Sequence, residues 1–143
     1  MKQYVVGLVF DKEMEQVLLL KRSKMPYQGL YNGVGGKVED GEEPSQAMYR
    51  ELQEETGLQL AQMHTAKYIT SLQYPSGIQL VVYYFVLREK GFPLPIGNEI
   101  DEGRLEWVSI TNQNLLDASN PYLAGDGNIS YFIHFARTLQ KKN

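Results

Sequence analysis

Three glutamates, Glu51, Glu54 and Glu55, lie close together in one polar segment of the sequence. On an α-helix, which turns 100° per residue, they fall within an arc of roughly 100° and span roughly 6 Å along the axis. Like charges at this spacing repel one another by roughly a few tenths of a kcal/mol per pair, and a bound cation would offset that repulsion. Carboxylate oxygens at this density suit a hard ion, Mg²⁺ or Mn²⁺, better than zinc or copper. On the helix alone, a solvated glutamate-rich face is the commoner arrangement.

The net charge of the chain is a second argument for a bound cation. The 143 residues carry a formal net charge of −3, which speaks against a dedicated nucleic-acid-binding protein, because such proteins usually present a strongly basic face. An acidic protein that binds a phosphate-bearing substrate needs a cation between the two, and Mg²⁺ typically joins a few carboxylates to substrate phosphate oxygens. The absence of cysteine excludes thiolate metal sites, cysteine nucleophiles and a disulfide scaffold.

Length and hydropathy limit the architecture and the location. A chain of 143 residues predicts a single domain, 1–143, around one core. The longest unbroken apolar run is Leu80–Leu87, far shorter than the roughly 20 residues of a membrane helix. The first ten residues lack the cleavage site of a signal peptide and are typical of a first strand. We therefore expect a cytoplasmic monomer or homodimer with a small-molecule substrate and no membrane or nucleic-acid partner.

The elements that position the acids follow from apolar patterns and turn residues. The helix over 44–56 is the clearest, because Pro44 suits the first helical position and Gly57 suits a left-handed end. The expected strands are 4–10, 16–22, 33–38, 67–74, 78–88 and 104–110, with loops over 23–32 and 90–103, a short helix over 112–117 and a longer helix over 129–139. The first two strands and the pair around Pro75-Ser76-Gly77 predict hairpins. This order predicts an α/β/α sandwich around a mixed sheet.

The register around the acidic helix distinguishes it from an ordinary solvated one. From Gly36, five residues lead to Glu42, seven more follow, and then comes Arg50-Glu51-Leu52-Gln53-Glu54-Glu55-Thr56-Gly57-Leu58. This is the pattern Gx5Ex7REUxEExGU, with U aliphatic, and a chance match is on the order of one in a billion per starting position. Segment 36–58 therefore resembles the Nudix box, and the chain resembles a Nudix (MutT-like) hydrolase.

The resemblance implies the Nudix fold and Mg²⁺-dependent hydrolysis of a diphosphate bond in a nucleoside diphosphate linked to another group. The implied metal ligands are the carbonyl of Gly36 and the carboxylates of Glu51, Glu54 and Glu55. The implied catalytic group is Glu51, Glu54 and Arg50. Glu51 matches the position of the general base in some members, and Arg50 matches an arginine that orients the helix acids through ion pairs, with Glu42 as a candidate partner.

Acids outside the box are candidates for one more metal ligand. Some family members take a ligand from the acid before the tryptophan of the strand that follows the long loop. Glu106, which precedes Trp107, matches that position. The nearby acids Glu99, Asp101 and Glu102 are alternatives, and so is an acidic loop that is only solvated.

Four residues are candidates for substrate binding: Arg22, Asn32, Gly35 and Lys37. Arg22 is a better phosphate ligand than its neighbours Lys21 and Lys24, because guanidinium binds phosphate bidentately. Segment 30–38 resembles the corresponding stretch of the subfamily that hydrolyses oxidised purine nucleoside triphosphates such as 8-oxo-dGTP. Asn32 matches the asparagine that reads the base there, since an amide both donates and accepts. Alternatively, Asn32 only forms a turn before a glycine.

The substrate prediction combines these resemblances. The subfamily has a pair of base-reading acids near its last helix, and Asp126 is the single acid in the matching region here. The first prediction is hydrolysis of a nucleoside triphosphate to the monophosphate and pyrophosphate. Alternatives within the enzyme class are a nucleotide sugar, a dinucleotide polyphosphate or a pyrimidine triphosphate. A nucleotide-sensing module without activity is less favoured, because such modules usually lack one or more box acids.

Overall fold

A computed structural model describes residues 2–91, 99–125 and 127–142 of the chain. Its strands are β1 (Lys2–Phe10), β2 (Gln16–Arg22), β3 (Tyr31–Asn32), β4 (Val34–Lys37), β5 (Met63–Gln73), β6 (Ile78–Leu87), β7 (Glu99–Ile100) and β8 (Gly103–Ser109). Its helices are α1 (Pro44–Thr56), the short 3₁₀ helix η1 (Leu60–Gln62) and α2 (Asn128–Lys141). The strands form one mixed sheet in the order β5-β6-β1-β2-β8-β7, in which β3 pairs with β2 and β4 with β1.

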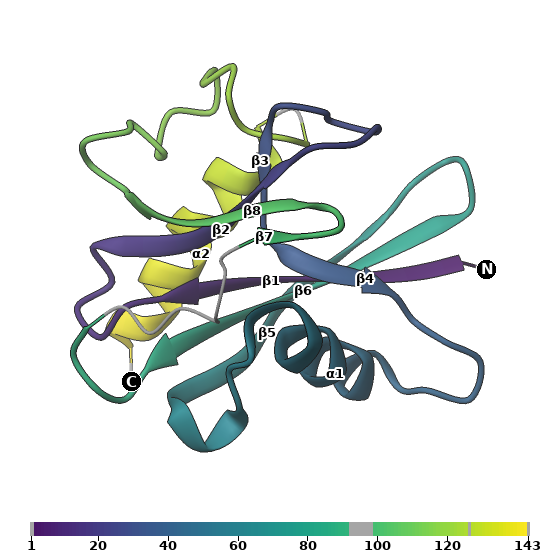
Figure 1. Cartoon of the computed structure of the whole chain (residues 1–143), viewed down its shortest axis with the longest axis horizontal. Coiled ribbons are helices and arrows are strands. Elements are labelled where there is room, and N and C mark those ends of the chain that lie inside the picture. Colours follow the sequence, from purple (N-terminus) through teal and green to yellow (C-terminus); the bar gives the residue numbers. More distant parts are fainter. Residues whose placement is uncertain (1, 92–98, 126, 143) are drawn as a thin grey trace.

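Both faces of the sheet are covered, which explains why the parallel neighbours β1 and β6 are almost continuously apolar. Successive side chains of β1 point to opposite faces, so that Leu8 packs in the core cluster of α2 and Val9 in the core cluster of α1. Figure 1 shows α1 on the near side of the sheet and α2 on the far side. The predicted α/β class, with a mixed sheet between helices, is confirmed.

Helix α1 has the predicted bounds, and local interactions at both ends explain them. At its start, Pro44 occupies the first turn, and the Oε1 of Gln46 accepts a hydrogen bond from the backbone N–H of Glu43 at 2.9 Å. At its end, Gly57 has a φ of 75°, a left-handed conformation that glycine adopts without strain. Ala47, Met48 and Leu52 bury one side of α1 against the sheet. Glu55 is buried on the same side and points toward β4, where its Oε1 accepts a hydrogen bond from the N–H of Gly35.

Strands β1 and β2 separate after a short contact. They pair only at Val9↔Leu18 and Phe10↔Val17, beyond which β4 pairs with β1 and β3 with β2. Gly35 in β4 lies so close to β1 that a Cβ there would overlap the carbonyl oxygen of Val5. All four strands contribute to the wall of one cavity at this separation.

Some elements differ from their predicted bounds. Residues 112–117 form turns instead of a short helix: Asn114 has a φ of 56°, and the Oδ1 of Asp117 accepts from the backbone N–H of Ser119. The predicted loop 23–32 ends in β3, and the predicted loop 90–103 contains β7, although 92–98 lie outside the described residues. Strand β5 and helix α2 are both longer than predicted. None of the described helices is long and apolar enough to span a membrane.

Candidate active site

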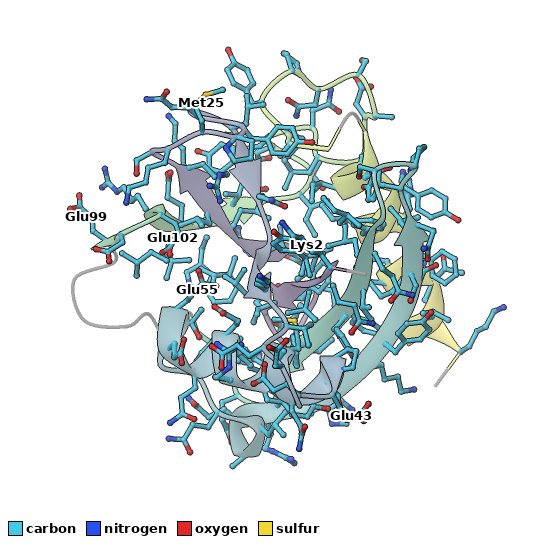
Figure 2. The ribbon with its side chains drawn as sticks, turned by 90° about the vertical axis from the view of Figure 1, so that its right-hand side faces the viewer. Lys2, Met25, Glu43, Glu55, Glu99 and Glu102 are labelled. Atoms are coloured by element: carbon cyan, nitrogen blue, oxygen red, sulfur yellow. The ribbon has the colours of Figure 1, made fainter. Side chains whose placement is uncertain are left out.

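One cavity of about 700 Å³ brings most of the candidate residues together. It lies between the start of β1, the ends of β2 and β3, strand β4, helix α1, the turn between β5 and β6, and the start of α2. The predicted site residues that line it are Arg22, Asn32, Gly35, Gly36, Lys37, Glu51 and Glu55. Glu102, in the turn between β7 and β8, lines it as well. Figure 2 shows Glu102 and Glu55 on neighbouring parts of the molecule.

Glu55 is a buried acid held by the backbone of β4. Its side chain projects from α1, and its Oε1 accepts a hydrogen bond from the N–H of Gly35 at 2.8 Å. Burial raises the pKa of Glu55 to about 8; the hydrogen bond from Gly35 opposes this rise, and the charges of Glu51, Glu102 and Glu54 add to it. A carboxylate in this environment is stabilised by any cation that enters the cavity.

The raised pKa of Glu55 predicts a pH dependence of stability in the metal-free protein. The folded state binds the proton of Glu55 up to about pH 8, whereas the unfolded chain releases it near the ordinary pKa of about 4.3. The contribution of Glu55 to stability is therefore fully present below pH 4 and is lost as the pH rises toward 8. Thermal unfolding in EDTA should show Tm falling by about 5 °C or more between pH 5 and pH 8. Glu55→Gln should remove most of this slope, and an equal slope in the variant would contradict the assignment.

Arg50 organises the other acids of the site. Its guanidinium binds Glu42 through two contacts, Nε to Oε2 at 2.7 Å and Nη2 to Oε1 at 3.0 Å, and it donates to the carbonyl of Lys37 at 3.1 Å. Its Nη1 reaches Glu51 Oε1 at 2.9 Å and Glu54 Oε2 at 3.4 Å. The hydrogen bonds from Arg50 are the main reason why the pKa of Glu42 falls to about 2. The orienting role expected for Arg50, with Glu42 as partner, agrees with this geometry.

Glu51 and Gly36 are fitted closely to each other. A Cβ on Gly36 would lie 2.6 Å from Glu51 Oε1, so any other residue here would force this carboxylate to move. Burial raises the pKa of Glu51, and the hydrogen bond from Arg50 opposes this change. Glu54 is more peripheral, because 60% of its side chain is exposed.

The donor set has the chemistry of a hard divalent cation site. The carboxylates of Glu51, Glu55 and Glu102 and the backbone of Gly36 line the same cavity, and all offer oxygen. Among the described residues, no three His, Cys, Asp or Glu side chains already converge closely enough to hold a metal ion. Arg50 occupies one oxygen of Glu51. The residues therefore fit a divalent cation in type and location, and its binding requires their side chains to turn toward one another.

Glu106 does not join this group, contrary to the prediction. It is paired with Leu19 across β2 and β8, and Leu19 packs in the core cluster of α2. Directly paired residues of antiparallel strands share a face, so Glu106 lies on the face opposite α1. There its Oε2 accepts a hydrogen bond from the hydroxyl of Tyr31 at 3.2 Å. The acid that approaches Glu51 and Glu55 is Glu102, one of the alternatives.

A matched pair of substitutions tests whether Glu102, rather than Glu106, acts with Glu51 and Glu55. Glu102→Gln should lower kcat by about tenfold or more, because it removes a carboxylate from the cavity. Glu106→Gln keeps an acceptor for Tyr31 and should change kcat by less than about twofold. Steady-state hydrolysis at saturating Mg²⁺ checks both. The reverse ranking would restore Glu106 as the ligand.

The basic candidates differ in their access to the cavity. Arg22 lines it, and its Nε donates to the carbonyl of Pro26 at 2.6 Å, which anchors the guanidinium at the mouth. Lys37 also lines it. The Nζ of Lys21 lies 5.9 Å from the centre of the Tyr31 ring, and Lys24 is not part of the wall. Of the basic candidates, Arg22 and Lys37 are therefore the two that line the same cavity as the acids.

The amide and aromatic part of the cavity wall was only partly predicted. Asn32 belongs to the wall, and its Oδ1 accepts a hydrogen bond from the N–H of Gly33 at 2.8 Å. Further wall residues were not predicted: Tyr27, Tyr74, Asn128, Ile129 and Phe132. The signal available for Asn128 was an amide at the start of the last helix. Asp126, the acid considered, lies outside the described residues.

Comparisons with known proteins agree with this fold. The family description that matches residues 1–123 is that of the NUDIX domain. The 8-oxo-dGTP diphosphatase of Escherichia coli (strain K12) is 30% identical over 125 residues, which cover 85% of this chain and 93% of that protein. The NAD-capped RNA hydrolase NudC of Stutzerimonas stutzeri (strain A1501) is 34% identical over 101 residues, 71% of this chain and 35% of that protein. The crystal structure of a mutator MutT protein from Bacillus halodurans has a TM-score of 0.63 at 26% identity, covering 94% of this chain and 83% of that one.

Proposed function

The chain belongs to the Nudix family and is a hydrolase of phosphate anhydrides, and from this premise we propose that its substrate is a purine nucleoside triphosphate, including the oxidised forms, cleaved to the monophosphate and pyrophosphate. The observation that carries the proposal is that the wall of one cavity combines two sets of groups: carboxylates from α1 and the β7–β8 turn, and amide and aromatic side chains from β3, the loop before it, the β5–β6 turn and the start of α2. A nucleotide also has two parts, its phosphates and its base. We propose that the carboxylates mark the acidic end of the cavity, which takes the phosphates, and that the amide and aromatic groups mark the other end, which takes the base.

The acidic end suits the anhydride. Glu51, Glu55, Glu102 and the carbonyl of Gly36 are the groups that would hold a divalent cation, for which we propose Mg²⁺, with Glu54 at the rim. When bound, such a cation neutralises charge on the diphosphate oxygens and acidifies water. Among the protein's own groups, Arg50 orients the carboxylates, and a carboxylate that is not engaged with the cation accepts the proton of the attacking water.

The bases near the acidic end assist by charge. Arg22 and Lys37 line the cavity, and guanidinium and ammonium groups stabilise the negative charge that remains on the phosphates. The guanidinium of Arg22 can exchange its hydrogen bond with the carbonyl of Pro26 for one with a phosphate oxygen. This supports a substrate with more than one phosphate group.

The other end suits a purine. Phe132, Ile129 and Tyr27 supply apolar and aromatic surface for a flat ring, and the amides of Asn32 and Asn128 supply donors and acceptors for its edge. The relatives named 8-oxo-dGTP diphosphatase, from Escherichia coli and Haemophilus influenzae, support a guanine-type base.

A substrate panel tests the proposal. Purified protein with Mg²⁺ is offered 8-oxo-dGTP, dGTP, dATP, dCTP, a nucleotide sugar and a dinucleoside tetraphosphate, and pyrophosphate and phosphate release are measured separately. We expect the highest kcat/KM with a guanine-type triphosphate and release of pyrophosphate. Preference for one of the other classes would replace the substrate, and nucleotide binding with no turnover of any compound would indicate a sensing module.

A further inference from the structure

A second, smaller hollow lies beside the active-site cavity, where β2 ends and β8 begins. It has a volume of about 360 Å³, and its wall consists of residues 21–23, 99–100 and 103–104. The charged side chains among them are those of Lys21, Arg22, Arg104 and Glu99. We propose that this hollow binds the terminal phosphate of the triphosphate, so that the enzyme prefers nucleoside triphosphates to nucleoside diphosphates. This proposal rests on the proposed function.

The hollow and the active-site cavity adjoin each other at two points. Arg22 lines both. Glu102 lines the cavity, and the next residue, Gly103, lines the hollow. The two points are held together, because Arg22 is paired with Gly103 across β2 and β8, and the N–H of Ser23 donates to the carbonyl of Glu102 at 2.9 Å. An anhydride held between Arg22 and Glu102 would therefore place a further phosphate next to the hollow.

Two like charges in the wall are directly opposed. Lys21 and Arg104 are paired across the antiparallel strands β2 and β8, so their side chains leave on the same face, with Cβ atoms about 5 Å apart. Like charges at this spacing destabilise a sheet. Among the described residues, neither side chain takes part in an ion pair. A bound anion would offset their repulsion.

Neighbouring acids leave this positive charge largely in place. Glu99 is paired with Arg104 across β7 and β8, yet the two described side chains form no ion pair. Glu106 shares a face with Arg104, but its Oε2 accepts a hydrogen bond from the hydroxyl of Tyr31, and it is not part of the wall. Segment 92–98, which lies outside the described residues, contains no charged residue. The hollow thus concentrates positive charge in a chain whose net charge is −3.

The cations of the hollow offer donors that suit a phosphate group. The Nζ of Lys21 lies 5.9 Å from the centre of the Tyr31 ring, a contact that leaves its N–H groups open to an oxygen acceptor. The guanidinium of Arg104 can donate to two phosphate oxygens at once. A nucleoside diphosphate bound through the same anhydride would have no phosphate at this position. The triphosphate alone gains these charge-assisted hydrogen bonds.

The test compares kcat/KM for dGTP and dGDP at saturating Mg²⁺, and the wild type should prefer dGTP. Lys21→Gln and Arg104→Gln each remove one positive charge from the hollow, and neither residue lines the active-site cavity. Each should reduce the dGTP-to-dGDP ratio by about five- to tenfold, the scale of one charge-assisted hydrogen bond. The matched control is Lys12→Gln, at an exposed position in the β1–β2 turn outside both walls, which should leave the ratio unchanged.

The acid of the hollow provides a test in the opposite direction. Glu99→Gln removes a negative charge from the wall, so it should raise the dGTP-to-dGDP ratio by about twofold, as expected for an exposed charge. An unchanged or lower ratio in this variant would overturn the proposal. A wild type without a preference for dGTP would also overturn it, as would Lys21→Gln and Arg104→Gln ratios equal to that of Lys12→Gln.

Inhibition by the product gives a measurement that does not depend on the base. Pyrophosphate keeps the terminal phosphate, so it should inhibit dGTP hydrolysis competitively, with a Ki that rises by about five- to tenfold in Arg104→Gln. The Ki should be unchanged in Lys12→Gln, and equal values in both variants would count against the hollow as the site. Absence of turnover with every nucleoside triphosphate would instead be the failure of the proposed function.

Discussion

Replacing Glu55 by glutamine is expected to lower kcat by about 10² or more while the protein remains folded. In the cation-bound protein the substitution removes a negative charge from the cavity, and it keeps an oxygen that can accept the hydrogen bond from Gly35. In the metal-free protein it replaces a buried acid whose pKa is raised, so the cost to stability should be small. Steady-state kinetics give kcat, and circular dichroism reports the fold.

Two further substitutions provide comparisons for Glu55→Gln. Glu54→Gln should also lower kcat by about 10² if Glu54 takes part in metal binding, although its side chain is largely exposed. Glu89→Gln, at an exposed position outside the cavity wall, serves as the matched control and should be neutral. Activity close to that of the wild type in both Glu55→Gln and Glu54→Gln would contradict the proposed role of the acids.

Removal of divalent metal should abolish turnover, and Mg²⁺ should restore it. Without a bound cation, the ionised carboxylates in the cavity wall repel the phosphate groups of the substrate. The measurement is hydrolysis after treatment with EDTA, followed by titration with Mg²⁺ and, in parallel, Mn²⁺. Full activity of the chelated protein would refute a metal-dependent mechanism.

Binding of the cation can be observed separately from activity. Mg²⁺ should raise the Tm of the wild type, because a ligand that binds only the folded state stabilises it. The increase should be reduced in Glu55→Gln and kept in Glu89→Gln. A similar increase in all three proteins would place the cation elsewhere.

Local signals made the acidic helix α1 predictable from the sequence. Pro44 and Gly57 mark the ends of α1, and the spacing of Glu51, Glu54 and Glu55 places them within one arc of the helix. Each of these signals acts within a few residues, so no knowledge of the tertiary structure is needed. The ion pair between Arg50 and Glu42, separated by eight residues, was expected from the resemblance of segment 36–58 to the Nudix box.

Contacts between distant segments were not predictable in the same way. Whether Glu106 or Glu102 approaches α1 depends on the register between β2 and β8, and a shift of one residue would move Glu106 to the other face. Tyr74 and Asn128 are 54 residues apart, and only the packing of the β5–β6 turn against α2 brings them together. The turns over 112–117 replaced a predicted helix because side chains such as Asp117 satisfy backbone groups locally.

The separation of β1 from β2 has a consequence for how this enzyme can diversify. The acids come from α1 and one turn, whereas the groups that we propose face the base come from β3, the β5–β6 turn and the start of α2. Substitutions in the second set leave the hydrolytic apparatus in place, so the scaffold can acquire a new preferred nucleotide without having to rebuild its chemistry.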